Sequence, residues 1–237
     1  MTTAIIIQAR MGSTRLPGKA MHELNGKPVL AHVIERCKKV EGIDLVGLAV
    51  PKLPSSQPMI KLASALGMHT FQGEEHDVLG RYVGAVFWYE PLLSRKIDVV
   101  MRITADCPLI DPEICTKVLA RFKKEKAEYA SNVHPRSFPK GLDCEVFTTE
   151  ILFRACKTTH DNYDREHVTP WIVKNSRRIN LASGRFDLAQ HRWTLDYPED
   201  LEFMRALAKL GPINSMSEIL RTIKDNPELL AINAKAA

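Results

Sequence analysis

The sequence is short of cysteine and aromatic residues, and it contains no long apolar run. Its five cysteines are an odd number without a C-x-x-C pair, which disfavours a disulfide framework or structural zinc and favours reduced intracellular thiols. No stretch approaches about 18 apolar residues, so no membrane insertion is expected. Residues 1–10 lack the basic start and long apolar segment of a signal peptide. These absences predict a cytoplasmic protein.

Neither sign of charge is in large excess, because 33 Lys and Arg residues nearly balance 28 Asp and Glu residues and leave a net charge of +5. A surplus this small is only a weak indication of an anionic partner. Nucleic acid is not expected as a partner, since no basic stretch is interleaved with aromatic residues. With 45% hydrophobic residues in a chain of 237, the composition excludes disorder and fits one domain spanning residues 1–237.

Short apolar runs alternate with helical spacings through the first half of the chain. Strands are predicted at 3–8, 44–50, 68–71 and 97–103, and helices at 28–37, 59–66, 78–89 and 112–126. This alternation predicts an α/β fold with a mostly parallel central sheet flanked by helices. Beyond residue 127 the rhythm changes, with strands expected at 128–132, 144–148, 178–182 and 191–194. Helices are expected there at 150–157, 164–174, 198–210 and 215–223.

A basic loop follows directly after the first predicted strand and reads Q-A-R-M-G-S-T-R-L-P-G-K from Gln8 to Lys19. Ligands of open α/β sheets bind beyond the carboxyl ends of strands. Glycines there let backbone N–H groups approach phosphate, and Arg and Lys neutralise it. The loop matches neither the Walker spacing nor G-x-G-x-x-G, which disfavours an NAD-dependent oxidoreductase. It predicts a phosphate-binding loop, with a solvated basic turn as the alternative.

Two aspartates that follow predicted strands are candidate functional carboxylates. Asp106, in R-I-T-A-D-C-P-L-I-D, would lie across the crevice from the basic loop if the strand order is 3-2-1-4. A carboxylate beside phosphates requires a divalent cation between them, and one or two carboxylates typically hold Mg²⁺ there. Asp111 is instead predicted to cap the helix that begins at Pro112. Asp196, in R-W-T-L-D-Y-P-E-D-L, is either a functional carboxylate or a helix cap.

These three stretches resemble the cytidylyltransferase family that activates acidic sugars, including the synthetases of CMP-sialic acid and CMP-3-deoxy-manno-octulosonate. The resemblance runs in unbroken order from about residue 4 to 209 and is strongest to the spore coat polysaccharide biosynthesis protein F group. It includes Ser131–Asn132, G-L-D-C-E-V-F at 141–147 and R-E-H-V-T-P at 165–170. It implies a Rossmann-like nucleotidyltransferase fold with a small β/α insertion. The implied activity is Mg-dependent transfer of CMP from CTP to a hydroxyl of an acidic sugar or related acceptor, with pyrophosphate released, in surface polysaccharide biosynthesis.

The resemblance also implies roles for individual residues. Arg10, Lys19 and Asp106 are the catalytic candidates, and Asp106 and Asp196 are the implied Mg²⁺ ligands. The implied nucleotide-binding residues are Gln8, Ala9, Arg10, Met11, Gly12, Ser13, Arg15, Lys19, Asp77, Arg81, Thr104 and Asp106. The implied acceptor-binding residues are Asn132, Asp143, Glu145, Arg165, Glu166 and His167. His167 is either a catalytic base or a structural histidine.

The identity of the acceptor stays open, because this sequence has A-D-C-P where the octulosonate enzymes have G-D-E-P. Residues of about 134–170 are expected to bind the acceptor and to form the contact of a homodimer. Two other functions remain as alternatives. One is a nucleotidyltransferase that uses another NTP, and the other is a nucleotide-sugar-binding protein without turnover.

Overall fold

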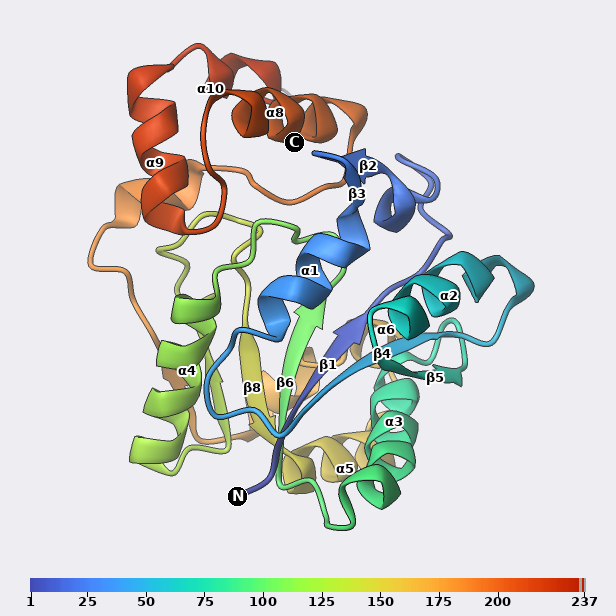
Figure 1. Ribbon diagram of the computed structural model, residues 1–237. Coiled ribbons are helices and arrows are strands. Elements are labelled where there is room, and N and C mark those ends of the chain that lie inside the picture. Colours follow the sequence, from blue (N-terminus) through green and yellow to red (C-terminus); the bar gives the residue numbers. More distant parts are fainter. Residues whose placement is uncertain (235, 237) are drawn as a thin grey trace.

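The computed structural model describes residues 1–234 and 236, and its centre is a seven-stranded sheet in the order β5-β4-β1-β6-β8-β7-β9 (Figure 1). The strands are β1 (Thr3–Gln8), β4 (Leu45–Pro51), β5 (His69–Gly73), β6 (Val99–Thr104), β7 (Tyr129–Ser131), β8 (Glu145–Thr148) and β9 (Arg178–Asn180). Adjacent strands are parallel except where β8 pairs with β6 and with β7. The mostly parallel sheet and the 3-2-1-4 order of the first four strands are confirmed.

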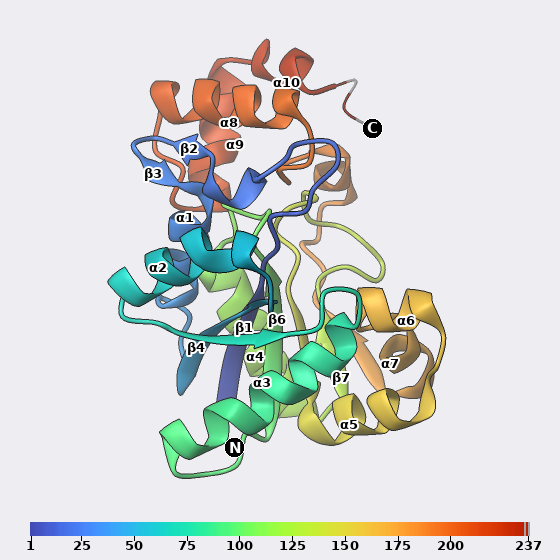
Figure 2. The same cartoon turned by 90° about the vertical axis from the view of Figure 1, so that its right-hand side faces the viewer.

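Helices cover both faces of the sheet because the side chains of β1 alternate between two apolar cores. Ile5 and Ile7 face a core shared with α1 (Val29–Cys37), α2 (Gln57–Ala65) and α4 (Pro112–Glu125). Ala4 and Ile6 face a second core with α3 (Val78–Leu93) and α5 (Thr149–Thr158). The short helices α6 (Asn162–His167) and α7 (Pro170–Asn175) lie beside α3 and α5 (Figure 2). A strand buried on both faces explains the uninterrupted apolar sequence of β1.

A third apolar cluster covers the end of the molecule toward which β1 and β6 point (Figures 1 and 2). It contains side chains of α8 (Pro198–Leu210) and α9 (Met216–Asp225), with α10 (Leu229–Ile232) beside them. Below α8 lies the small hairpin of β2 (Glu23–Leu24) and β3 (Lys27–Pro28). Trp193 and Leu195 are fully buried in this cluster. Their neighbours Thr194 and Asp196 instead line a cavity at the strand ends.

Two predicted elements were wrong. Residues 191–194 do not form a strand, and only Arg192 pairs in isolation with Lys140. The predicted helix at 164–174 is two helices, because Val168 has a φ of +71° and Pro170 begins α7. A proline has no backbone N–H to continue the preceding turn. The hairpin and the three-residue 3₁₀ helices Lys19–Met21 and Pro54–Ser56 had no prediction, since pieces this short leave no periodicity.

The other predicted helices are present with ends shifted by a few residues, and α8 has the predicted bounds. Asp111 caps α4 as predicted, because its Oδ1 accepts hydrogen bonds from the amides of Glu113 and Ile114 at 2.9 and 3.4 Å. Within residues 1–234 and 236, no helix has both the length and the apolar character needed to span a membrane.

Candidate active site

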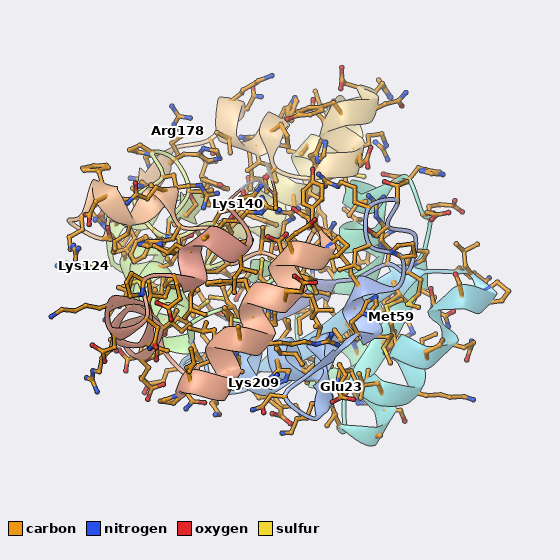
Figure 3. All side chains as sticks on the ribbon, turned by 90° about the horizontal axis from the view of Figure 1, so that it is seen from above. Glu23, Met59, Lys124, Lys140, Arg178 and Lys209 are labelled. Carbon is orange, nitrogen blue, oxygen red and sulfur yellow. The ribbon has the colours of Figure 1, made fainter. Side chains whose placement is uncertain are left out.

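Two adjoining cavities lie at the carboxyl ends of β1 and β6. The first has a volume of about 300 Å³ and is bordered by the basic loop, the start of α3 and β6. The second, about 680 Å³, is bordered by β6, β8 and the α6–α7 segment. Figure 3 looks down on this end of the molecule, and Lys140, which lines the second cavity, lies near the middle of the view. Both cavities share five lining residues, which are Arg102, Thr104, Asp106, His167 and Asp196.

The basic loop folds back on itself and directs Lys19 into the first cavity. Its Met11 carbonyl accepts hydrogen bonds from the amides of Ser13 and Gly18, at 2.9 and 3.1 Å. Gly18 has a φ of +67°, a conformation that favours glycine. The predicted loop residues that line the first cavity are Gln8, Ala9, Arg10, Gly12, Ser13, Arg15 and Lys19. Met11 differs, because it closes the loop through its backbone and packs its side chain against the core.

Lys19 joins the two predicted metal ligands. Its Nζ lies 2.8 Å from Asp106 Oδ2 and 2.8 Å from Asp196 Oδ1. The other Asp106 oxygen accepts a 2.5 Å hydrogen bond from the Thr104 hydroxyl, and the other Asp196 oxygen one of 3.1 Å from Arg192. Two carboxylates thus converge on a single cationic atom at the wall shared by both cavities.

The pKa values of this cluster shift in the directions that keep all three groups ionised. Burial lowers the pKa of Lys19, but Asp106 and Asp196 more than reverse this and leave that pKa raised. Burial raises the pKa of each aspartate, and Lys19 outweighs it in both, so both carboxyl pKa values are lowered. Thr104 adds to the effect on Asp106, and Arg192 to that on Asp196. The cluster is an ion triad at neutral pH.

Backbone contacts between distant segments bring the two aspartates together. The Leu195 amide donates to the Asp106 carbonyl at 2.8 Å, and the Trp193 amide donates to the Lys140 carbonyl at 2.7 Å. The capping alternative for Asp196 was wrong, because Tyr197 occupies the N-cap of α8 and the Asp196 carboxylate contacts cations.

Arg192 and Asp200 hold Asp196 in position through hydrogen bonds, and this role was not predicted from the sequence. Asp200 is fully buried and contacts Arg192 at 2.8 and 2.9 Å. It also accepts hydrogen bonds from the amides of Asp196 and Tyr197 at 2.9 and 3.0 Å. Both residues stand in the R-W-T-L-D-Y-P-E-D motif, at spacings of four on either side of Asp196. That spacing was the available signal.

Asp77 and Arg81 differ in their relation to the first cavity. Asp77 caps α3 by accepting from the Gly80 amide at 2.9 Å, pairs with Arg165 at 2.6 Å, and does not line the cavity. Arg81 lines the cavity although its side chain is buried. Its Nη1 donates to the carbonyls of Glu74 and Glu75, while its buried Nε has no hydrogen-bond partner among the described residues.

Of the six predicted acceptor-binding residues, three line the second cavity and three do not. Asp143 and Glu145 line it in ion pairs, with Arg136 at 2.6 Å and Arg102 at 2.5 Å respectively. His167 lines both cavities.

The remaining three have other positions. Asn132 is buried and holds the Leu142 carbonyl and the Cys144 amide at 2.6 and 2.9 Å. Arg165 holds Asp77, and Glu166 lies on the first cavity, 3.6 Å from Arg10.

Three further cations line the cavities without having been predicted: Arg102, Lys140 and Lys174. Arg102 had a signal, since it lies two residues before Thr104 and so shares its face of β6. The two lysines stand outside any motif. Among the described residues, no group of three or more His, Cys, Asp and Glu side chains is arranged to hold a metal ion. Any metal ion here would depend on two carboxylates and on ligands from a substrate.

The cytidylyltransferase family model matches residues 4–222. The chain belongs to the cytidylyltransferase family. A relative in Methanocaldococcus jannaschii, "Uncharacterized protein MJ1063", is 32% identical over 235 residues, covering 97% of this chain and 93% of the relative. The spore coat polysaccharide biosynthesis protein SpsF of Bacillus subtilis is 29% identical over 236 residues, covering 94% of both chains.

Solved structures agree with this assignment. A cytidylyltransferase from Leptospira borgpetersenii superposes with a TM-score of 0.89 at 30% identity, over 97% of this chain and 96% of that one. A CMP:2-keto-3-deoxy-manno-octonic acid synthetase complexed with CTP superposes with a TM-score of 0.63 at 19% identity, over 88% and 99%. The predicted nucleotidyltransferase-like α/β fold and the resemblance to this family are confirmed, and the protein is a nucleotidyltransferase.

Proposed function

We propose that this cytidylyltransferase transfers CMP from CTP to a hydroxyl of an acidic sugar or related acceptor, releasing pyrophosphate, in surface polysaccharide biosynthesis. The observation that carries the proposal is the wall shared by the two cavities, where Asp106 and Asp196 converge on Lys19. A transfer reaction needs two substrates that meet at one reacting centre. The first cavity, which the basic loop lines, suits the nucleotide, and the adjoining second cavity suits the acceptor.

In the first cavity, Arg10, Arg15 and Lys19 are placed to bind the triphosphate. They line only this cavity, so their positive charge would stabilise the bound nucleotide and the pyrophosphate that is released. Arg81 is the candidate for recognising the base, because it lines this cavity and its Nη2 makes no hydrogen bond to the described residues. Cytosine presents two neighbouring acceptors, O2 and N3, that a guanidinium edge matches with paired donors.

Asp106 and Asp196 fit a Mg²⁺ site of the kind the family uses. Their oxygens already surround one cationic centre, and two carboxylates leave the other positions to phosphate oxygens and water. When bound, Mg²⁺ would neutralise charge on the triphosphate and orient it for in-line attack. Lys19 would then move its ammonium group from the carboxylates toward the β- and γ-phosphates.

In the proposed step the acceptor hydroxyl oxygen forms a bond to the α-phosphorus, and the bond from that phosphorus to the β-phosphate oxygen breaks. His167 lies on the shared wall and is the candidate for taking the hydroxyl proton. The alternative is a structural role, since its ring packs 4.4 Å from that of Tyr163. Because both cavities draw on residues from 8 to 196, we propose that the chain acts as one domain.

CTP is expected to stabilise the protein more than ATP, GTP or UTP in the presence of Mg²⁺. A ligand that binds only the native state at about 100 times its Kd adds roughly 2.7 kcal/mol, a rise in Tm of roughly 5–10 °C for a chain of this size. Differential scanning fluorimetry with the four nucleotides measures this. Equal shifts for all four would contradict cytosine recognition and favour a nucleotidyltransferase of broader specificity.

Turnover is tested with CTP, Mg²⁺ and a panel of sugar acids and neutral sugars. The expected products are a CMP conjugate, identified by mass spectrometry, and pyrophosphate in equal amount. Stabilisation by CTP without pyrophosphate release from any panel member would instead favour the binding protein without turnover. Light scattering of the same sample tests the proposed homodimer, for which residues 134–170 are the candidate contact.

A further inference from the structure

Arg102 is held in a fixed position between the two cavities. Its Nε donates to Gln8 Oε1 at 3.2 Å, and its Nη1 donates to Glu145 Oε2 at 2.5 Å. Glu145 is buried, and its other oxygen accepts a 2.6 Å hydrogen bond from the Tyr129 hydroxyl. Both oxygens of Glu145 are therefore occupied within the protein. This carboxylate acts on Arg102, and we do not assign it a direct contact with the acceptor.

The guanidinium of Arg102 keeps one nitrogen for a ligand. Nη2 makes no hydrogen bond to the residues that the structure describes, and it is not among the buried unpaired atoms. It is therefore open at the cavity wall. Burial lowers the pKa of Arg102, but Glu145 outweighs burial and the net pKa is raised, so the group stays charged. A preorganised, permanently charged donor of this kind is suited to stabilising charge that develops during a reaction.

The distribution of cations shows what Arg102 faces. Arg10, Arg15, Lys19 and Arg81 line the first cavity alone, and Lys140 and Lys174 line the second alone. Arg102 is the one Lys or Arg, among the described residues, that lines both. If CTP occupies the first cavity and the acceptor the second, the group between them is the α-phosphoryl group. The loop cations are placed to bind the pyrophosphate that departs. Arg102 is therefore the cation available to the phosphoryl group that is transferred.

We propose that Arg102 is a catalytic residue, whose Nη2 donates a hydrogen bond to a non-bridging oxygen of the α-phosphoryl group during CMP transfer. This rests on the proposed function and adds a residue to it. Gln8 and Glu145 fix the plane of the guanidinium, so that little reorganisation is needed when charge builds on the phosphoryl oxygens. Lysine at this position would keep the charge but lose the two-sided support, because an ammonium group is not a planar fork.

Binding of CTP to Arg102→Lys tests the contact without an acceptor. In ³¹P NMR spectra with Mg²⁺, the α-phosphorus resonance of bound CTP is expected to shift relative to wild type, while the β and γ resonances stay in place. With an acceptor found by the panel, turnover should fall by roughly 10²-fold, as for loss of one preorganised donor, with the KM for CTP changed less than about threefold. Arg36→Lys is the matched control, because it makes the same change at a buried arginine that donates to backbone carbonyls and lines neither cavity.

An unchanged α resonance in Arg102→Lys with CTP bound would overturn the inference, as would the same shift in Arg36→Lys. A higher KM for the acceptor with an unchanged α resonance would mean that Arg102 binds the acceptor, and would also overturn it. If Arg102→Lys does not fold, Arg102→Gln combined with Glu145→Gln removes both buried charges and is measured in the same way. A wild-type protein that does not bind CTP would contradict the proposed function itself, which separates the two failures.

Discussion

Asp106→Asn and Asp196→Asn are each expected to lower turnover by roughly 10²-fold or more, a loss of about 2.7 kcal/mol or above in transition-state stabilisation. Each change keeps the shape of the side chain but removes a charged ligand for a hard cation. The Mg²⁺ concentration that gives half-maximal CTP binding, measured by calorimetry, should rise in both variants. Each protein should stay folded, since Lys19 keeps one carboxylate partner in either case.

The double variant distinguishes a shared metal site from two separate roles. Losing one ligand already damages the site that the other serves, so the two effects on turnover should not add. Asp111→Asn is the matched control, because Asp111 caps α4 and lines neither cavity. Additive losses, or an unchanged requirement for Mg²⁺, would contradict a common metal site for Asp106 and Asp196.

The parts of this fold that the sequence predicted are those with a local cause. The strands β1, β4 and β6 are short apolar runs buried on both faces, and α4 is an apolar periodicity with a capping aspartate before a proline. The position of the basic loop followed from the rule that ligands bind beyond the carboxyl ends of parallel strands. The break at Val168 was missed although Pro170 signalled a boundary.

No local sequence pattern predicts that Asp106 and Asp196 lie close together. Their proximity depends on Trp193 and Leu195 being buried under α8 and α9, which turns Asp196 toward β6. The Leu195 amide also donates to the Asp106 carbonyl, which joins segments about 90 residues apart, and no spacing within either segment encodes this contact. The family resemblance supplied what periodicity lacked, because it placed both aspartates at the triphosphate.

Two other predicted site residues use their polar groups within the protein itself in this structure. Asp77 precedes a helix with an amide to cap, and its carboxylate is used there and on Arg165. Asn132 bridges two backbone segments around β8 instead of facing the cavity. Polar residues near a site serve the backbone as often as the ligand, and only their hydrogen bonds decide which.

Lys19→Met is expected to destabilise the protein in the absence of substrate and to weaken binding of CTP more than binding of CMP. Without its ammonium group, the partly buried Asp106 carboxylate loses its cationic partner, and Asp196 keeps only Arg192 and Arg15. The cost is roughly 1–2 kcal/mol, less than for a fully buried pair because these side chains keep some solvent exposure. Thermal unfolding with and without Mg²⁺ measures it, and the deficit should shrink with Mg²⁺, since a divalent cation can replace the missing charge.

The pH dependence of this deficit follows from the lowered pKa values of the aspartates and the raised pKa of Lys19. The carboxylates contribute stability above their unfolded pKa and lose it as pH falls through the folded pKa. Lys19 contributes below its unfolded pKa and loses it as pH rises through the folded value. The difference in unfolding free energy between wild type and Lys19→Met should therefore shrink in acid, where the carboxylates are protonated, and above about pH 10, where Lys19 loses its proton.

For the nucleotides, loss of one charged hydrogen bond should raise the Kd for CTP by roughly 10- to 100-fold. The Kd for CMP should change much less, because CMP lacks the β- and γ-phosphates that Lys19 is proposed to bind. Lys27→Met is the matched control, since Lys27 pairs with Glu35 on the surface and lines neither the first nor the second cavity. Equal losses for CTP and CMP would show that Lys19 does not bind the leaving group. Lys19 would then stay between Asp106 and Asp196 throughout the reaction, where its ammonium group neutralises the two carboxylates.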